Sequence, residues 1–248
     1  METFVNTRIE NGVGEIEFFH PKSNSLPSEL LNKLAVEIKK AGDNSDIKSI
    51  LITSGGDKAF CAGASFDELL LIKDEIQGKS FFSGFAQVIN AIKNAPKLVV
   101  TALQGKVVGG GLGIVCVSDY VVASPKASSK LTELSLGIGP FVIGPILERK
   151  LGLSHFINMA LSPNKWKSAD WCLDKGMYSE IADSAKERAK EVALCYAKYS
   201  TEAMKEMKNM FWDKYPGIER EMELRAEQSG RLVLSESTVK ILKAFKSS

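Results

Sequence analysis

Two glycine-bearing loops contain the residues whose types and spacing point most directly to chemistry. The stretch VVGGGLGI, residues 107–114, has glycine at four of its eight positions and lies in one of the most apolar parts of the chain. The stretch KAFCAGASF, residues 58–66, is a second loop of mostly small residues. Glycine allows a backbone to approach a ligand closely, and a helix start has N–H groups without intrahelical partners. Both loops could therefore present backbone amides to a ligand.

Three interpretations of these glycines follow from the residues alone. Phosphate binding is disfavoured, because the stretch departs from the G-x-G-x-x-G spacing and no lysine completes a P-loop. An oxyanion hole suits the loops, since two N–H groups from separate loops can stabilise one developing negative oxygen. Close packing of a helix on a strand, with no ligand, is as compatible with the residues as an oxyanion hole is. The residues alone leave these last two interpretations open.

The other reactive residue types exclude several kinds of site. Only His20 and His155 are histidines, so a histidine-rich metal site is excluded and a Ser-His-Asp relay would need one of these two. No G-x-S-x-G motif marks a nucleophilic serine. The cysteines form no C-x-x-C pair and match no zinc spacing, so we expect no metal and reduced, mostly buried thiols. The cysteines are Cys61, Cys116, Cys172 and Cys195.

The composition is that of a soluble globular protein. Hydrophobic residues make up 44% of the 248 positions, and 32 basic residues nearly balance 30 acidic ones. No basic block indicates nucleic acid or an anionic membrane as a partner. The longest apolar run, residues 107–117, is far shorter than the roughly 20 residues that span a bilayer. The first residues lack the apolar segment of a signal peptide, and we therefore expect a cytoplasmic protein.

Alternating strands and helices are predicted to position the two loops. Apolar runs of strand length predict an N-terminal hairpin followed by buried parallel strands, each loop coming directly after one of them. A helix that begins near Ser28 and a second at 81–93 lie between the strands, and residues 66–79 are expected to be mobile. The predicted strands are 4–9, 13–19, 48–53, 98–102 and 120–123.

Helical periodicity dominates the sequence from residue 141 onward. An α/β front followed by a mostly helical back is thus the predicted organisation, with no sequence repeat and no low-complexity linker. The predicted helices are 141–151, 167–175, 185–198, 201–212, 218–230 and 235–245.

Four segments, in matching order and spacing, resemble the crotonase superfamily, the enoyl-CoA hydratase/isomerase family. HPKSNSL (20–26) is similar to its RPxxxNAL turn, and AFCAGASFDEL (59–69) resembles its AFxAGAD-type loop. QGKVVGGGLGIVCVSDYVVAS (104–124) resembles the GxxxGGGxxxxxxxD signature, and KLTELSLGIGP (130–140) resembles the xxPExxLGxxP segment. The resemblance covers nearly the whole chain.

The resemblance implies an α/β fold, the ClpP/crotonase-like spiral of ββα units. It implies a core domain at residues 1–190 and a C-terminal helical trimerisation region at residues 191–248, forming a homotrimer or a dimer of trimers. It also implies an acyl-CoA substrate, with coenzyme A as part of that substrate and no tightly bound cofactor. The family's oxyanion hole maps onto the backbone N–H groups of Ala64 and Gly110. The resemblance therefore favours the oxyanion hole as the interpretation of the glycines.

The acids of the family's motifs indicate the reaction. Hydratases of the family carry two glutamates, and the positions that match them here are Gly113 and Glu133. One carboxylate suffices to move a proton between two carbons, so the resemblance favours Δ3,Δ2-enoyl-CoA isomerisation with Glu133 as the base. We expect an apolar pocket to raise the pKa of Glu133. Hydration of an enoyl-CoA, including the methylglutaconyl-CoA type, and a non-catalytic CoA-binding role are the alternatives. A second acid could come from Asp67, Glu68, Asp74 or Glu75.

Further residues are matched to substrate binding through the resemblance. Lys22 is expected near the phosphates of coenzyme A, and Phe245 is expected to reach the coenzyme A of a neighbouring subunit. Asp119 is expected to be structural and Cys61 to be a packing residue. The remaining expected substrate-binding residues are Ala62, Phe66, Gly109 and Phe141, and other aromatic candidates for the acyl pocket are Phe81, Phe82, Phe85, Trp166 and Trp171.

Overall fold

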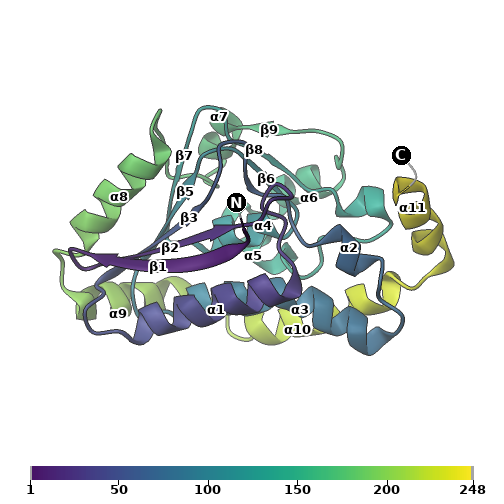
Figure 1. Cartoon of the computed structure of the whole chain (residues 1–248), viewed down its shortest axis with the longest axis horizontal. Coiled ribbons are helices and arrows are strands. Elements are labelled where there is room, and N and C mark those ends of the chain that lie inside the picture. The colour runs from purple at the N-terminus through teal and green to yellow at the C-terminus, as the bar shows by residue number, and fades with distance from the viewer. Residues whose placement is uncertain (1, 247–248) are drawn as a thin grey trace.

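Two sheets organise the fold, as the computed structural model shows for residues 2–246 (Figure 1). The larger sheet has six strands, in the spatial order β1 (Phe4–Glu10), β2 (Val13–Phe19), β3 (Ser49–Ser54), β5 (Val99–Leu103), β7 (Tyr120–Ala123) and β10 (Glu180–Ile181). The smaller sheet has four strands, in the order β4 (Ala59–Cys61), β6 (Lys106–Val108), β8 (Ser128–Lys130) and β9 (Lys167–Ser168).

The larger sheet confirms the predicted strands. β1 and β2 form the antiparallel hairpin, with Phe4 opposite Phe19, and each later neighbour in the sheet is parallel to the one before it. Every residue of β3 and β5 is buried, because helices cover both faces of the sheet. This double coverage explains why these strands are continuous apolar runs and do not alternate between polar and apolar residues.

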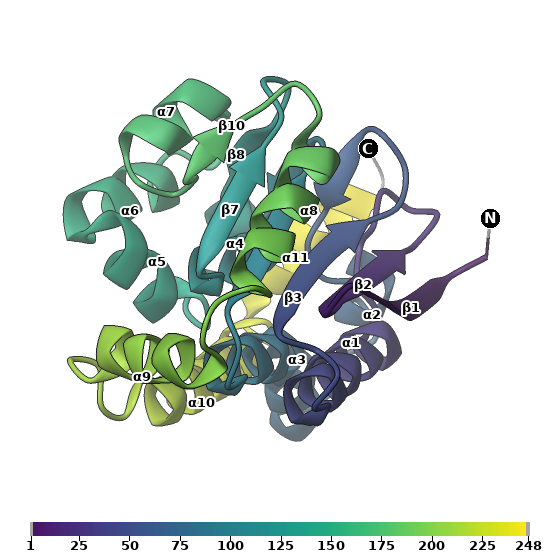
Figure 2. The ribbon, with the colours of Figure 1, turned by 90° about the vertical axis from the view of Figure 1, so that its left-hand side faces the viewer.

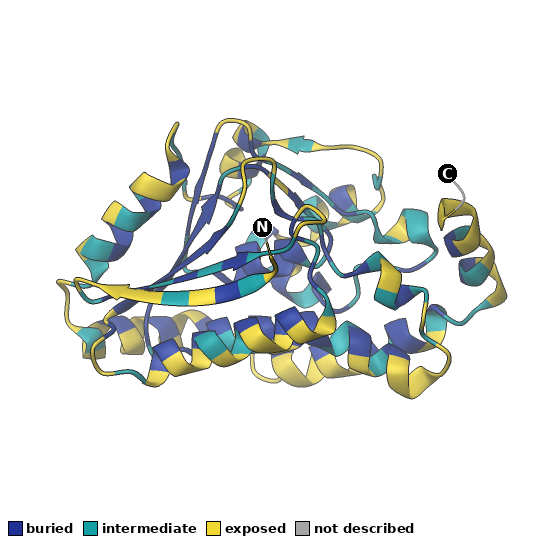
Figure 3. Cartoon of the chain, in the orientation of Figure 1, coloured by how far each residue is buried: buried dark blue, intermediate teal, exposed yellow. Residues whose placement is uncertain are grey.

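Helices cover the two faces of the larger sheet. α8 (Ala185–Tyr196) lies on one face, where its small residues pack on Leu51, Val100 and Val122 (Figure 2). α1 (Ser28–Asp43) and α3 (Glu75–Asn94) belong to the main core on the other face. Figure 3 shows α1 with its inner side buried and its outer side exposed, as its apolar periodicity predicts.

The segment at 66–79, expected to be mobile, is instead mostly helical. α2 (Phe66–Leu69) occupies its start, and α3 begins at Glu75, six residues before the predicted helix start. Asp74 caps α3, since its carboxylate accepts the N–H of Gln77 at 2.8 Å. Residues 75–77 are exposed, but Gly78 is buried against α10 (Ile218–Leu232), in close backbone contact with Gly230. The structure thus gives this segment two helices that the sequence did not indicate, and a cap and a distant helix hold the start of α3.

Between residues 131 and 246 the chain is mostly helical, and its strands there are the short β9 and β10. The predicted helix at 141–151 is shorter than expected, and α6 was not predicted. α8 runs across residue 190 and packs on the sheet, so the expected boundary between residues 190 and 191 falls inside a helix. The remaining helices are α4 (Gly111–Val117), the 3₁₀ turn η1 (Glu133–Leu136), α5 (Gly144–Leu151), α6 (Leu153–Ala160), α7 (Ala169–Asp174), α9 (Thr201–Trp212) and α11 (Glu236–Lys246).

Across residues 2–246, every helix falls short of the length and apolarity that a membrane crossing needs. Within the same range, His, Cys, Asp and Glu side chains nowhere gather in threes that could hold a metal ion. Three cysteines are buried as expected, and Cys195 is exposed.

Asp119 forms a buried ion pair that fastens α9 to the larger sheet. Its carboxylate lies 2.9 Å from the ammonium nitrogen of Lys208, and the two side chains are 8% and 3% exposed. The same carboxylate accepts the N–H of Val99 at 2.7 Å, and Lys208 donates to the carbonyl oxygens of Ile92 and Lys97. These contacts confirm that Asp119 is structural.

Lys208→Met should lower the free energy of unfolding by about 3–5 kcal/mol, because it leaves the Asp119 carboxylate buried without its cation. Chemical denaturation of the variant and of Lys205→Met, an exposed neighbour on α9, measures the difference. Equal stability of the two variants would show that the pair does not stabilise the fold.

Candidate active site

Three adjacent strands of the smaller sheet carry the main elements of the candidate site. β4, β6 and β8 are parallel neighbours, so their carboxyl ends lie at one edge of the sheet. Ala64 follows β4, Gly110 follows β6, and Glu133 follows β8. In parallel sheets, ligands bind beyond this edge. The predicted loops thus follow strands of three residues each, and not β3 and β5 directly as the sequence suggested.

The loop after β4 is fixed by the turn that precedes α1. Leu26 donates its N–H to the carbonyl oxygen of Gly63 at 2.8 Å, and its own carbonyl accepts the N–H of Ser65 at 3.2 Å. Gly63 has a φ of +92°, a conformation that glycine adopts without strain. The N–H of Ala64 lies between these two bonds and, within residues 2–246, has no hydrogen-bond acceptor.

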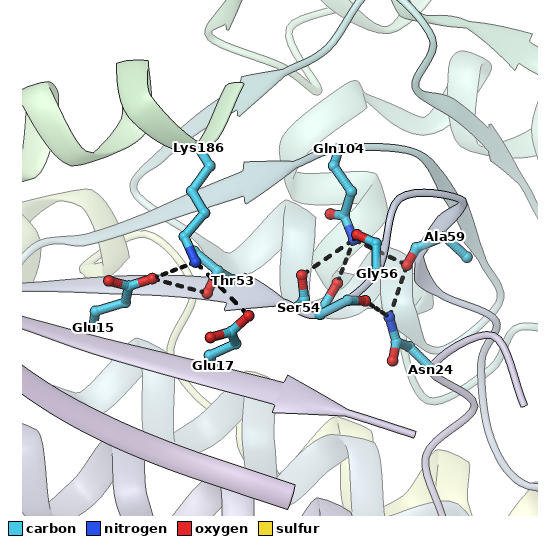
Figure 4. Close-up of polar contacts among 10 residues, drawn as sticks. Glu15, Glu17, Asn24, Thr53, Ser54, Gly56, Ala59, Gln104 and Lys186 are labelled. Atoms are coloured by element: carbon cyan, nitrogen blue, oxygen red, sulfur yellow. Dashed lines mark hydrogen bonds and ion pairs between the residues drawn. The ribbon is translucent and has the colours of Figure 1, made fainter. Parts of the chain in front are cut away.

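Two side-chain amides hold the connection between β3 and β4, as Figure 4 shows. Asn24 donates to the carbonyl oxygens of Gly55 and Ala59, both at 2.8 Å. Gln104 donates to Ala59 at 3.1 Å and to the Ser54 hydroxyl at 2.9 Å. Because both amides bind the Ala59 carbonyl at the start of β4, they fix the strand that leads to Ala64.

The loop after β6 places a second free amide beside the first loop. Gly109 has a φ of +54° and donates its N–H to the carbonyl oxygen of Lys130 at 3.1 Å, which ties the loop to β8. The N–H of Gly110 has no acceptor within the part of the chain that the structure describes. A Cβ atom on Gly63 would lie 4.0 Å from the Gly110 nitrogen, so the two loops touch.

Ala64 and Gly110, whose amides are free, both line one cavity of about 180 Å³. Of the expected site residues, the cavity brings together Ala62, Ala64, Phe66, Gly109, Gly110, Glu133 and Phe141, with Phe81, Phe82 and Phe85. A larger open groove of about 1100 Å³ lies between α3 and the segment that joins α9 to α10, but it includes neither loop. The smaller cavity is therefore the candidate site.

Among residues 2–246, Glu133 is the only ionisable residue that lines this cavity. Part of its side-chain surface is accessible from the cavity, but protein surrounds the carboxyl group, and this burial raises its pKa to about 7. One carboxylate oxygen accepts the N–H of Thr132 at 2.8 Å, which limits the rise in pKa. A Cβ atom on Gly109 would lie 3.1 Å from the other oxygen, so only glycine leaves this face of the carboxylate open.

Apolar side chains occupy the space where Gly113 could have carried a second acid. A Cβ atom on Gly113 would lie 2.7 Å from the Ile89 side chain and 2.8 Å from that of Ile143. Contacts under 3 Å require these side chains to move. Ile89 of α3 and Ile143 of the turn before α5 thus pack on α4 at Gly113, the position where a second glutamate would stand.

Comparison with known proteins identifies the family. The family model for enoyl-CoA hydratase/isomerase matches residues 8–240. The chain belongs to this family. A probable enoyl-CoA hydratase from Bacillus subtilis (strain 168) is 27% identical to this protein. The alignment covers 97% of this chain and 95% of the hydratase's length. A carnitinyl-CoA dehydratase from Salmonella enteritidis PT4 is 28% identical, over 72% of this chain and 70% of its own.

Solved structures of the enoyl-CoA hydratase/isomerase family share the fold. An enoyl-CoA hydratase from Bacillus halodurans matches with a TM-score of 0.90 at 22% identity, over 97% of this chain and 99% of its own. The predicted crotonase fold is therefore confirmed, and the chain is an enzyme of the hydratase/isomerase type, as the sequence indicated.

Four other acids were candidates for a second catalytic carboxylate, and all of them lie outside the cavity. Asp67 is exposed and forms an ion pair with Lys22, which lowers the pKa of Asp67. Glu68 accepts the N–H and hydroxyl of Ser28, at 2.9 and 2.7 Å. Asp74 caps α3, and Glu75 is exposed in the first turn of that helix.

Several expected site residues of this family member do not reach the cavity. Lys22 lies beside α2, and Phe245 is half-exposed on α11, so their contacts with coenzyme A stay predictions. Trp166 lies between Lys106 and Lys130, and Trp171 packs on His155. Cys61 is buried, and burial raises the pKa of its thiol to about 12, which agrees with the expected packing role.

Sequence reasoning missed three residues that position the family's site. Asn24 and Gln104 hold β4, and Thr238 of α11 donates its hydroxyl to the carbonyl oxygen of Gly137 at 2.7 Å, which supports the end of η1. Asn24 lies in the quoted turn HPKSNSL, so its motif could have identified it. Thr238 gives no such signal, because its partner lies 101 positions away in the chain.

Proposed function

We propose that this protein moves the double bond of a 3-enoyl-CoA to the 2,3 position. The observation that carries the proposal is that one carboxylate of the described residues, Glu133, lines a mostly apolar cavity together with Ala64 and Gly110, whose amides have no partner. The coarser assignment to the enoyl-CoA hydratase/isomerase family supports an acyl-CoA substrate.

The proposed mechanism uses Glu133 for both proton transfers. Its carboxylate removes a proton from C2, and the electron pair moves to the thioester oxygen as the enolate forms. The amides of Ala64 and Gly110 donate to this oxygen, and one such donor typically stabilises the transition state by about 3 kcal/mol. The double bond then shifts from C3–C4 to C2–C3 as Glu133 returns the proton to C4, so no atom is gained or lost.

Enoyl-CoA hydration is the second candidate, because the relatives with printed functions are mostly hydratases or dehydratases. Adding water requires a group that holds and deprotonates the water as well as a proton donor for C2. The packing of Ile89 and Ile143 around Gly113 favours isomerisation, since the cavity then offers one carboxylate for this work.

The products formed from 3-hexenoyl-CoA test the proposal. NMR of the reaction should show 2-hexenoyl-CoA forming well before any 3-hydroxyhexanoyl-CoA. Hydration of 2-hexenoyl-CoA as fast as the isomerisation would assign the hydratase reaction. No conversion of either substrate, with acyl-CoA binding retained, would indicate a non-catalytic binding protein.

The raised pKa of Glu133 predicts a pH dependence for the isomerisation. The base acts only when deprotonated, so kcat/KM should fall about tenfold per pH unit below a pKa of about 7 and level off above it. Initial rates between pH 5 and pH 9 measure the profile. A flat profile down to pH 5 would mean that the carboxylate has an ordinary pKa or is not the base.

Homotrimer formation stays a proposal beside the reaction. Exposed Met207, Met210 and Phe211 on α9 support self-association through the C-terminal helices, since apolar groups of this size favour burial.

A further inference from the structure

The cavity lies between two apolar clusters of the protein. Phe85, Val142 and Ile143 belong to the main core. Leu69, Phe81 and Ile138, which also line the cavity, belong to a separate cluster with residues from the end of α10 and from α11. The space for an acyl group is therefore bounded by two packed walls, and the polar groups at its edge are the loop amides, Glu133 and a few hydroxyls.

The size of the cavity limits the length of the acyl chain. An apolar cavity of about 150 Å³ in another protein holds one benzene molecule, which has six carbons. The volume here, about 180 Å³, is only slightly larger. Because the thioester carbonyl must also fit beside the two amides, an acyl group that stays within the cavity has about six carbons or fewer.

The charge of the cavity limits the chemistry of the acyl group. Its lining residues include no lysine, arginine or histidine, and their one ionisable group is the Glu133 carboxyl. A carboxylate at the far end of an acyl chain would be desolvated among phenylalanine rings without a cation. A terminal methyl group would be buried favourably in the same place.

We propose that the site selects a short, uncharged acyl group of about four to six carbons on its thioester, and that Phe141 limits its length. This inference rests on the proposed function and argues against an acyl group with a distal carboxylate, including the methylglutaconyl type. Phe141 is half-buried in the cavity wall, and its ring lies 2.6 Å from a Cβ position on Gly139. The ring therefore packs directly on the backbone of its own turn, in space that only a glycine at position 139 leaves free.

Binding of unreactive saturated acyl-CoAs tests the inference separately from the reaction. Calorimetry with butanoyl-, hexanoyl-, octanoyl- and dodecanoyl-CoA should show tightest binding at four to six carbons, with about fourfold tighter binding for each methylene that fits. Glutaryl-CoA should bind at least tenfold more weakly than pentanoyl-CoA, which has the same number of carbons but ends in a methyl group.

Two variants test the role of Phe141. Phe141→Ala should move the tightest binding to chains about two to four carbons longer. Tyr199→Ala, at an exposed aromatic residue between α8 and α9 and outside the cavity, should leave the preference unchanged. Circular dichroism confirms that each variant is folded before binding is compared.

Each contrary outcome would refute one part of the inference. Dodecanoyl-CoA binding as tightly as hexanoyl-CoA would refute the length limit, and equal binding of glutaryl- and pentanoyl-CoA would refute the charge limit. An unchanged preference in folded Phe141→Ala would refute the role of that residue. If no acyl-CoA binds better than coenzyme A itself, the proposed function fails along with the inference.

Discussion

Glu133→Gln should lower kcat for the isomerisation by about 10³- to 10⁴-fold, because an amide cannot accept the C2 proton. The substitution preserves the shape of the side chain, and the amide oxygen can still accept the N–H of Thr132 that holds the carboxylate now. Acyl-CoA binding should therefore stay within a few-fold of the unsubstituted protein. Steady-state rates together with calorimetric binding measure the two effects separately.

The matched control for this loss is Asp67→Asn, which changes an exposed acid outside the cavity. Its kcat should be close to that of the unsubstituted protein, although loss of the ion pair with Lys22 can alter KM. If Glu133→Gln keeps full activity, Glu133 is not the base. If Asp67→Asn is the variant that loses activity, the base lies in the loop of α2.

Gly110→Ala should lower kcat by about 10²- to 10³-fold, the usual effect of losing one oxyanion donor. A Cβ atom at this position would lie 2.4 Å from the ring of Phe85, which is buried in the main core and cannot move away freely. The backbone at Gly110 must therefore shift, and its amide no longer points at the thioester oxygen. The loss should appear mainly in kcat, since the enolate depends on this bond more than the bound substrate does.

Gly42→Ala provides a matched glycine substitution away from the site. Gly42 lies near the end of α1, where a Cβ atom would meet Pro96 at 3.3 Å, a contact that small shifts relieve. This variant should keep full activity. Gly110→Ala with unchanged kcat and a normal unfolding midpoint would show that the Gly110 amide is not an oxyanion donor.

The sequence was most informative where the local backbone conformation or the burial of a strand restricts which residue types are possible. Gly63 and Gly109 both have positive φ, and both lie in the loops that glycine content indicated. The buried strands β3 and β5 were likewise visible, because a strand covered on both faces must be apolar throughout. Glu133 was identified through the resemblance of its segment, and the apolar surroundings then explain its raised pKa.

What the sequence did not show depends on contacts between distant segments. β4, β6 and β8 have three residues each, too few for a periodic pattern, and pairing with one another defines them. The support of β4 by Asn24 and Gln104 depends on carbonyl groups that only the fold brings near these amides. The size of the cavity follows from the packing of α10 on α3 and of α11 on η1, which no single segment encodes.

The most direct test of the central claim is a crystal structure with an enolate-like acyl-CoA analogue bound. We expect the analogue's oxygen within about 3.1 Å of the backbone nitrogens of both Ala64 and Gly110. We also expect the Glu133 carboxylate in reach of both C2 and C4, with no other carboxylate near the acyl group. An oxygen bound away from either amide, or a second carboxylate holding a water beside C3, would contradict the single-base mechanism.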